Sequence, residues 1–88
     1  MRKITPSERK VIERLIFAEG FDVLQTETGL SYGELRDDLM NLINSGLIYA
    51  FESDTHDSHT SPFIDVDNLE YFSFRATKSG LRAIKQLP

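Results

Sequence analysis

Near the N-terminus, apolar residues recur at the spacing that places them on one side of a helix. The stripe consists of Val11, Ile12, Leu15 and Ile16. The TPSE sequence before it is typical of a helix start, because the Thr and Glu side chains can bond each other's backbone N–H groups and proline suits the first turn. We therefore predict a helix over residues 5–19, ended by Gly20.

A second, shorter helix is predicted over residues 22–29 and ends at a glycine. Asp22 and Gln25 have the spacing of another capping box, and Val23 and Leu24 are expected to face inward. It is followed at once by a third helix, so that a tight Gly-containing turn joins the two. That arrangement is the helix-turn-helix pattern.

The third helix is predicted over residues 31–45. Ser31 and Glu34 have the spacing of a capping box at its start, and Gly46 ends it. Its apolar residues fall on one side and form the expected buried face: Leu35, Leu39, Leu42 and Ile43.

After Gly46 the apolar pattern changes from the period of a helix to that of a strand. Residues 47–51 and 69–75 are rich in aromatic and aliphatic side chains and are predicted to pair as an antiparallel hairpin. A last helix is predicted over 77–87. These elements predict one α+β domain over residues 1–88, with a long acidic loop at about 52–68.

Alternation along the second strand assigns its side chains to two faces. Phe72 and Phe74 share one face, which we expect to belong to the core. Tyr71 points the other way. Together with Tyr49 or Phe51 it is expected to form an exposed surface that a partner can contact.

Charge is unevenly distributed along the chain. The net charge is −4, from 10 Lys and Arg against 14 Asp and Glu. The stretch from Glu52 to Glu70 holds six of the acids and no Lys or Arg, whereas the residues after it carry bases and no acid. The overall charge counts against simple nucleic-acid binding, but its pattern is that of an acidic loop in a mildly basic frame.

Two motifs resemble those of winged helix-turn-helix regulators. LRDDLMNLINSGLIYAF, residues 35–51, is similar to the recognition helix, the following turn and the first wing strand of MarR-, ArsR- and PadR-like proteins. YFSFRATKSGLRAIKQ, residues 71–86, is similar to their second wing strand and next helix. The resemblance implies a small winged helix, with a three-helix helix-turn-helix core, a two-stranded β wing and a C-terminal helix. It also implies a DNA-binding transcription regulator, usually a homodimer.

The resemblance also implies which residues would contact DNA. The exposed side of the third helix would enter the major groove, where arginine can pair with guanine and asparagine with adenine. The candidates there are Ser31, Tyr32, Arg36 and Asn41. Basic residues elsewhere would contact phosphates, and the candidates for that role are Arg9, Lys10, Arg75 and Lys78.

The charge of the third helix leaves a second interpretation open. Arg36 is the one basic residue of its exposed side, and no base lies between Phe51 and Arg75 to contact phosphates from the wing. The alternative is a winged-helix protein–protein interaction module whose acidic surface binds a basic partner. Its candidate contact residues are Glu34, Asp37, Asp38 and Tyr71.

Other chemistry has little support. Metal-ligand residue types cluster at Asp54, His56, Asp57 and His59, but such residues also suit turns and water, and we predict no metal site and no cofactor. The sequence has no cysteine, no Gly-rich phosphate loop and no Ser/His/Asp arrangement on rigid elements, so we predict no enzyme activity. No apolar run reaches membrane-spanning length, and a cytoplasmic protein without membrane contact is expected.

Overall fold

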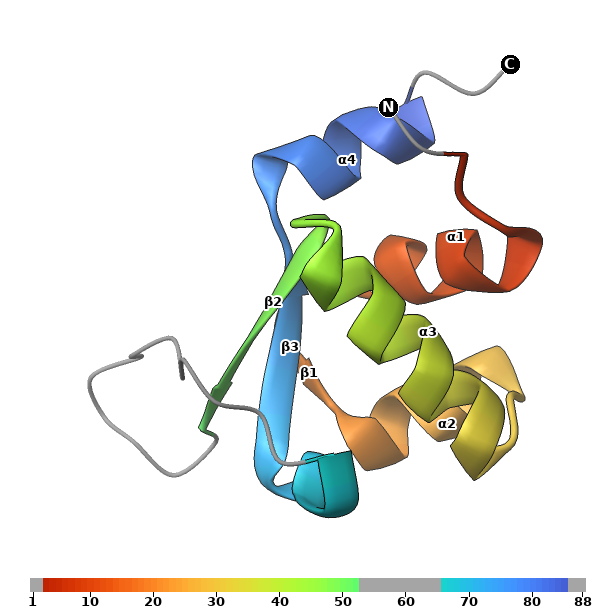
Figure 1. Ribbon diagram of the computed structural model, residues 1–88, viewed down its shortest axis with the longest axis vertical. Helices are drawn as coiled ribbons and strands as arrows, with labels where there is room; N and C mark the ends of the chain where they lie inside the picture. The colour runs from red at the N-terminus through yellow and green to blue at the C-terminus, as the bar shows by residue number, and fades with distance from the viewer. Residues whose placement is uncertain (1–2, 53–65, 86–88) are drawn as a thin grey trace.

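The computed structural model describes residues 3–52 and 66–85. They form a small α+β domain with four α-helices, a 3₁₀ helix and a three-stranded antiparallel sheet. The helices are α1 (Pro6–Glu13), α2 (Phe21–Thr28), α3 (Tyr32–Asn44), η1 (Val66–Tyr71) and α4 (Lys78–Lys85). The strands are β1 (Glu19–Gly20), β2 (Ile48–Glu52) and β3 (Phe72–Ala76), in the order β1-β3-β2. Figure 1 shows α1, α2 and α3 gathered on one side of the sheet, with α4 across its end.

One apolar core lies between these helices and the sheet. The buried face of α3 is the predicted one, since Leu35, Leu39 and Leu42 are fully buried, and Ile43 packs against the core from its edge. The predicted alternation of β3 is also confirmed. Phe72 and Phe74 are buried. The other large members of the core come from α1 and the turn after it, α2, β2 and η1: Val11, Ile12, Leu15, Phe21, Leu24, Ile48 and Leu69.

The first helix is shorter than predicted. Its start is correct, because the Thr5 hydroxyl accepts from the Glu8 amide and the Glu8 carboxylate accepts from the Thr5 amide. Its end is wrong by six residues, since α1 stops at Glu13 instead of at 19. The Leu15 carbonyl accepts from the Ala76 amide, 2.9 Å away, so the chain exchanges helical hydrogen bonds for a contact with the end of β3.

This early exit changes the roles of the next residues. Ile16, predicted to lie in the buried stripe, is 50% exposed, and Phe17 is 75% exposed. Glu19 and Gly20 form β1, which pairs with β3 and makes the sheet three-stranded rather than the predicted two-stranded wing. A two-residue strand has no period of its own in the sequence, so the hydrophobic pattern gave no sign of it.

The second helix begins one residue earlier than predicted, and the predicted Asp22–Gln25 capping box is absent. The N-cap is Gly20, without a side-chain hydrogen bond. Because the helix starts at Phe21, its buried face is formed by Phe21 and Leu24, and Val23 is 42% exposed rather than turned inward. The predicted end is correct, since Gly29 caps the helix with a φ of 73°.

The hairpin is present, with β2 and β3 antiparallel and Ile48 opposite Ala76. The second strand begins later than predicted because residues 69–71 belong to η1, where Leu69 turns into the core. Leu87 and most of the acidic loop, including Asp54, His56, Asp57 and His59, lie outside the described residues.

A tight joint connects the turn after α3 with the start of α4. The Thr77 amide donates to the Leu47 carbonyl at 3.0 Å, and the Thr77 hydroxyl donates to the Gly46 carbonyl at 2.8 Å. The same hydroxyl accepts from the Gly80 amide and so caps α4. A Cβ atom at Gly80 would overlap the Leu47 carbonyl oxygen, so only glycine allows this approach. We call Gly46, Leu47, Thr77 and Gly80 the α3–α4 joint.

Within the described residues, no helix has the length and apolar content needed to cross a lipid bilayer.

Candidate interaction surface of the third helix

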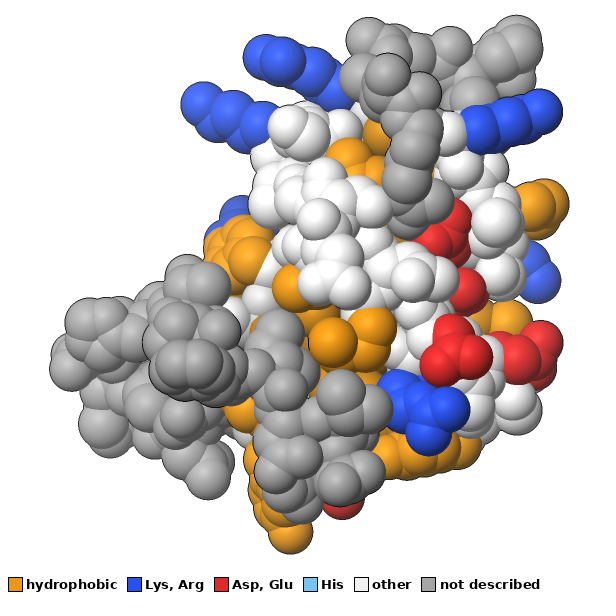
Figure 2. Space-filling view, viewed as in Figure 1, with side chains coloured by type: hydrophobic (Ala, Val, Ile, Leu, Met, Phe, Trp, Pro, Cys, Tyr) orange, Lys and Arg blue, Asp and Glu red, His pale blue; other side chains and the backbone are white. Residues whose placement is uncertain are grey.

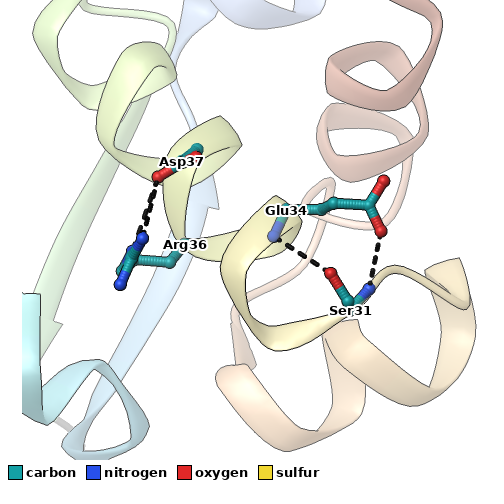
Figure 3. Close-up of polar contacts among 4 residues, drawn as sticks. All are labelled: Ser31, Glu34, Arg36 and Asp37. Atoms are coloured by element: carbon teal, nitrogen blue, oxygen red, sulfur yellow. Dashed lines mark hydrogen bonds and ion pairs between the residues drawn. The ribbon is translucent and has the colours of Figure 1, made fainter.

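The start of α3 is fixed by a complete capping box. The Ser31 hydroxyl accepts from the Glu34 amide at 3.2 Å, and the Glu34 carboxylate accepts from the Ser31 amide at 3.1 Å (Figure 3). These hydrogen bonds lower the pKa of Glu34, the bond from the Ser31 backbone being the larger cause. Ser31 and Glu34, candidates for DNA and protein contact respectively, are therefore both engaged in holding the helix end.

Tyr32 is also anchored. Its ring packs on that of Phe21, the first residue of α2, with ring centroids 5.1 Å apart and planes tilted by 50°. Tyr32 remains 42% exposed. The contact ties the start of α3 to the start of α2 and leaves one part of the tyrosine ring for a partner.

Arg36 lies on one flank of α3 and is paired with its neighbour. Its guanidinium donates from Nε and Nη2 to the Asp37 carboxylate, each at 3.4 Å. Figure 3 shows this pair and the Ser31–Glu34 capping box on opposite sides of the helix, with Glu34 directed toward α1. The side chains of Arg36 and Asp37 remain 40% and 69% exposed. An ion pair this exposed contributes little stability and can be opened by a ligand at small cost.

Asp38 differs from Asp37 although the two are adjacent. Its side chain is half-buried beside α1, and its Oδ2 atom is buried without a hydrogen-bond partner. Burial raises the pKa of Asp38, and the nearby negative charges of Glu8, Glu34 and Asp37 add to that increase. The Ser7 side chain opposes it by hydrogen bonding. Of these two candidate residues for protein contact, only Asp37 is fully exposed to a partner.

The solvent side of α3 is open along most of its length. Asp37, Asn41 and Asn44 are all exposed, and their spacing places them in one row along the helix. The row offers one carboxylate and two amides, with Arg36 on its flank. Asn41 is therefore placed where the sequence analysis expected it, and Asn44 extends the same row.

The four candidate phosphate contacts lie on other elements. Lys10 on α1, Arg75 on β3 and Lys78 on α4 are exposed, whereas Arg9 forms an ion pair with Glu13 at 3.6 Å. In Figure 2, acidic side chains gather beside α3, and basic side chains lie mainly at the α4 end of the molecule. The described side chains on this face are therefore unevenly charged, and the chain as a whole is acidic.

Tyr71 is 66% exposed at the end of η1, as the sequence analysis expected of a partner surface. It does not join the row on α3. Phe17, the most exposed large apolar side chain of the described residues, was missed because its residue was predicted to continue a helix. Among the described residues, no group of three or more His, Asp or Glu is arranged to hold a metal ion.

Comparison of the chain with protein-family models, with curated proteins and with solved structures finds no match.

Proposed function

We propose that this chain is a winged-helix DNA-binding protein acting as a transcription regulator, with α3 as its reading helix. The observation that carries the proposal is the presentation of α3, which is fixed at both ends and buried on one side while Asp37, Asn41 and Asn44 remain open to solvent. A helix held in this way can enter a major groove without rearrangement. The order of the described elements agrees with the resemblance, and its two motifs meet in the α3–α4 joint.

In this function the residues of α3 divide into reading and supporting roles. Arg36 leaves Asp37 and donates to a guanine, and Asn41 pairs with an adenine. The Ser31–Glu34 capping box and the Tyr32–Phe21 contact hold the helix in place. Exposed cations outside α3, such as Lys10 and Lys78, pair with phosphates and give the affinity its salt dependence.

The test is binding to mixed-sequence duplex DNA at a series of salt concentrations, followed by selection of a preferred sequence. An affinity that falls steeply with salt reports phosphate contacts directly. Arg36→Ala should then cost about 1–3 kcal/mol, concentrated at one base pair. The matched control is Arg82→Ala on α4, which removes the same charge and should weaken all sequences equally. If the two variants behave alike, α3 is not the reading helix.

A second candidate function is binding of a basic protein partner through α3. The observation that favours it is the acidic character of the open row, in which the 69% exposed Asp37 side chain engages the one cation of the helix. Like charge next to a phosphate backbone is unfavourable, whereas the same charge attracts a basic protein surface.

The change in duplex DNA affinity caused by one substitution distinguishes the two functions. Asp37→Asn should tighten duplex DNA binding at low salt if α3 faces DNA, because one repulsive charge is removed. If α3 faces a basic protein, the variant should slow association with that protein, and no duplex binding should be detected. Glu70→Gln, which removes an exposed charge from η1, controls for the change in net charge. Asp38 is unsuitable for this test because its side chain is half-buried.

A further inference from the structure

The sheet has a second face that the core does not use. In β3, Phe72, Phe74 and Ala76 are buried, whereas Ser73 and Arg75 alternate with them and point to the other face. In β2, Ile48 and Ala50 are buried and Tyr49 and Phe51 are only half-buried. Because α1, α2 and α3 all lie on the core side (Figure 1), two aromatic side chains occupy the outer side of the β2–β3 hairpin.

These side chains are arranged as a compact group. The register places Arg75 directly opposite Tyr49 and Ser73 opposite Phe51. The rings of Tyr49 and Phe51 have centroids 6.0 Å apart and planes tilted by 37°. On the far side of β3, Gly20 of β1 is paired with Ser73 and adds no side chain, and even a Cβ there would meet no atom within 4 Å. The face is therefore open toward β1.

The charged residue paired with Tyr49 is basic. Arg75 is exposed and forms no ion pair with a described residue, and Lys78 follows at the start of α4. Lys78, Arg82 and Lys85 recur at helical spacing and continue the basic side chains along the exposed side of α4. Figure 2 shows hydrophobic side chains beside a basic one on the β2 side of the molecule.

We propose that the outer face of β2 and β3 binds a single-stranded nucleic acid, with successive bases stacked on Tyr49 and Phe51 and a phosphate paired with Arg75. Unpaired bases expose flat π-faces that stack on aromatic side chains, and a neighbouring cation neutralises the backbone. Bases within a duplex are already stacked on each other and cannot use the rings in this way. This proposal goes beyond the proposed reading of duplex DNA and does not depend on it: the bases would be bound by the sheet and not by α3, although the cations of α4 serve both.

The chemistry favours a nucleic acid over an acidic peptide. A peptide carboxylate would need the cation alone, whereas two adjacent rings beside a guanidinium supply both interactions that a nucleotide requires. Because the chain carries a net charge of −4, attraction is local to Arg75 and α4, and the binding is expected to weaken sharply with salt.

The experiment measures the fluorescence anisotropy of an end-labelled oligothymidylate at low salt with the full chain and its variants. Tyr49→Thr and Phe51→Thr should each weaken binding about five- to 150-fold, the loss of one stacked base. Threonine keeps the strand propensity, and thermal unfolding checks that each variant folds. Phe17→Thr removes an exposed aromatic ring that lies outside β2 and β3 and should leave binding unchanged. Arg75→Gln should weaken binding and reduce its salt dependence.

Competition of three other polyanions with the labelled oligothymidylate tests which ligand the face binds. An abasic strand with the same number of phosphates should compete poorly, and equal competition would overturn the stacking. Polyglutamate should also compete poorly, and strong competition would assign the face to an acidic protein instead. Duplex DNA with the same number of phosphates should compete more weakly than a single strand, because its bases cannot stack on the rings, and stronger competition by the duplex would overturn the proposal. Failure to bind oligothymidylate even at low salt, or unchanged binding by both ring variants, would overturn the proposal.

The two proposals fail separately. Arg36→Ala on α3 should lower sequence-specific duplex binding and leave oligothymidylate binding intact, while Tyr49→Thr should do the reverse. A loss of oligothymidylate binding in Arg36→Ala equal to that in Tyr49→Thr would place the single strand on α3 and overturn the assignment to the sheet.

Discussion

The two ends of α3 are held in different ways. At the start, Ser31 and Glu34 exchange hydrogen bonds within a span of three residues, at the surface. At the other end, Gly46 is bonded by the hydroxyl of Thr77, a residue 31 positions further on. The first end is determined by local sequence. The second forms only when β3 and α4 have reached their final positions, so the direction of α3 depends on the whole fold.

The largest loss of stability is expected for a substitution in the α3–α4 joint. Gly80→Ala should destabilise the domain by about 3 kcal/mol, because the new Cβ would overlap the Leu47 carbonyl and force two backbone segments apart. Urea unfolding of the variant and of the unchanged protein measures this difference in the free energy of unfolding. The matched control is Gly33→Ala in α3, where a Cβ meets nothing within 4 Å and the helix should gain up to about 1 kcal/mol. Equal effects of the two substitutions would show that the joint is not tightly packed.

Removing one hydroxyl at each end of α3 allows the stability that each end contributes to be compared. Thr77→Val keeps the shape of the side chain but removes the bonds to Gly46 and Gly80, and should cost about 1–2 kcal/mol. Ser31→Ala removes the cap of α3 and should cost about 1 kcal/mol. The joint variant should also lower the protection of α4 against amide exchange, whereas the cap variant should affect only the start of α3. If Ser31→Ala lowered the amide protection of α4 as much as Thr77→Val does, the two ends of α3 would not be held independently.

The start of α3 should respond to pH and the joint should not. The pKa of Glu34 is lowered in the folded protein, so its contribution is present at neutral pH and is lost as the pH falls through that lowered value. Glu34→Gln should therefore destabilise at pH 7 and have a vanishing effect in acid. The joint contains no titratable side chain, and the cost of Thr77→Val should be the same at both pH values. Thermal unfolding across the acidic range measures both.

The smallest change in stability is expected for a substitution of Asp38, and this one should stabilise the domain. Burial raises the pKa of Asp38 in the folded protein, so the charged carboxylate lowers the free energy of unfolding. This loss of stability is complete at a pH above the folded-state pKa. It disappears as the pH falls below the pKa of the unfolded chain. Asp38→Asn should raise the midpoint of thermal unfolding slightly at pH 7 and leave it unchanged in strong acid. Asp37→Asn, at the exposed neighbour, is the control. A lower midpoint for Asp38→Asn at pH 7 would mean that its charge is stabilised by a partner.

Most features that depend on local sequence were predicted correctly, the exception being the Asp22–Gln25 capping box, which is absent because α2 begins at Phe21. The capping boxes at Thr5 and Ser31, the buried face of α3 and the alternation of β3 all follow from spacing within one element, and all are confirmed. The end of α1 was predicted wrongly because it is decided by the contact between Leu15 and Ala76, which lie at opposite ends of the chain. The same contact positions β1, which has no period of its own.

The candidate surface shows the same division. The exposure of Tyr32, Arg36 and Asn41 follows from helical spacing, and the structure agrees with it. The partial burial of Asp38 also follows from its spacing to Leu35 and Leu42, but its raised pKa does not, because it depends on where α1 packs against α3. Which partner the surface binds depends on charges brought together from several elements, and spacing along one element does not contain that information.

The α3–α4 joint also determines which parts of the backbone can open without the rest. The amide of Ala76 donates to the Leu15 carbonyl and that of Thr77 to the Leu47 carbonyl, so each can exchange with solvent only after two segments far apart in the sequence have separated. Their exchange should therefore require global unfolding and report its full free energy. The amide of Glu34 donates only to the nearby Ser31 hydroxyl and should exchange by fraying of one turn. The first turn of α3, which is held by local contacts, should therefore exchange faster than its last turn, which is tied to residues near the other end of the chain.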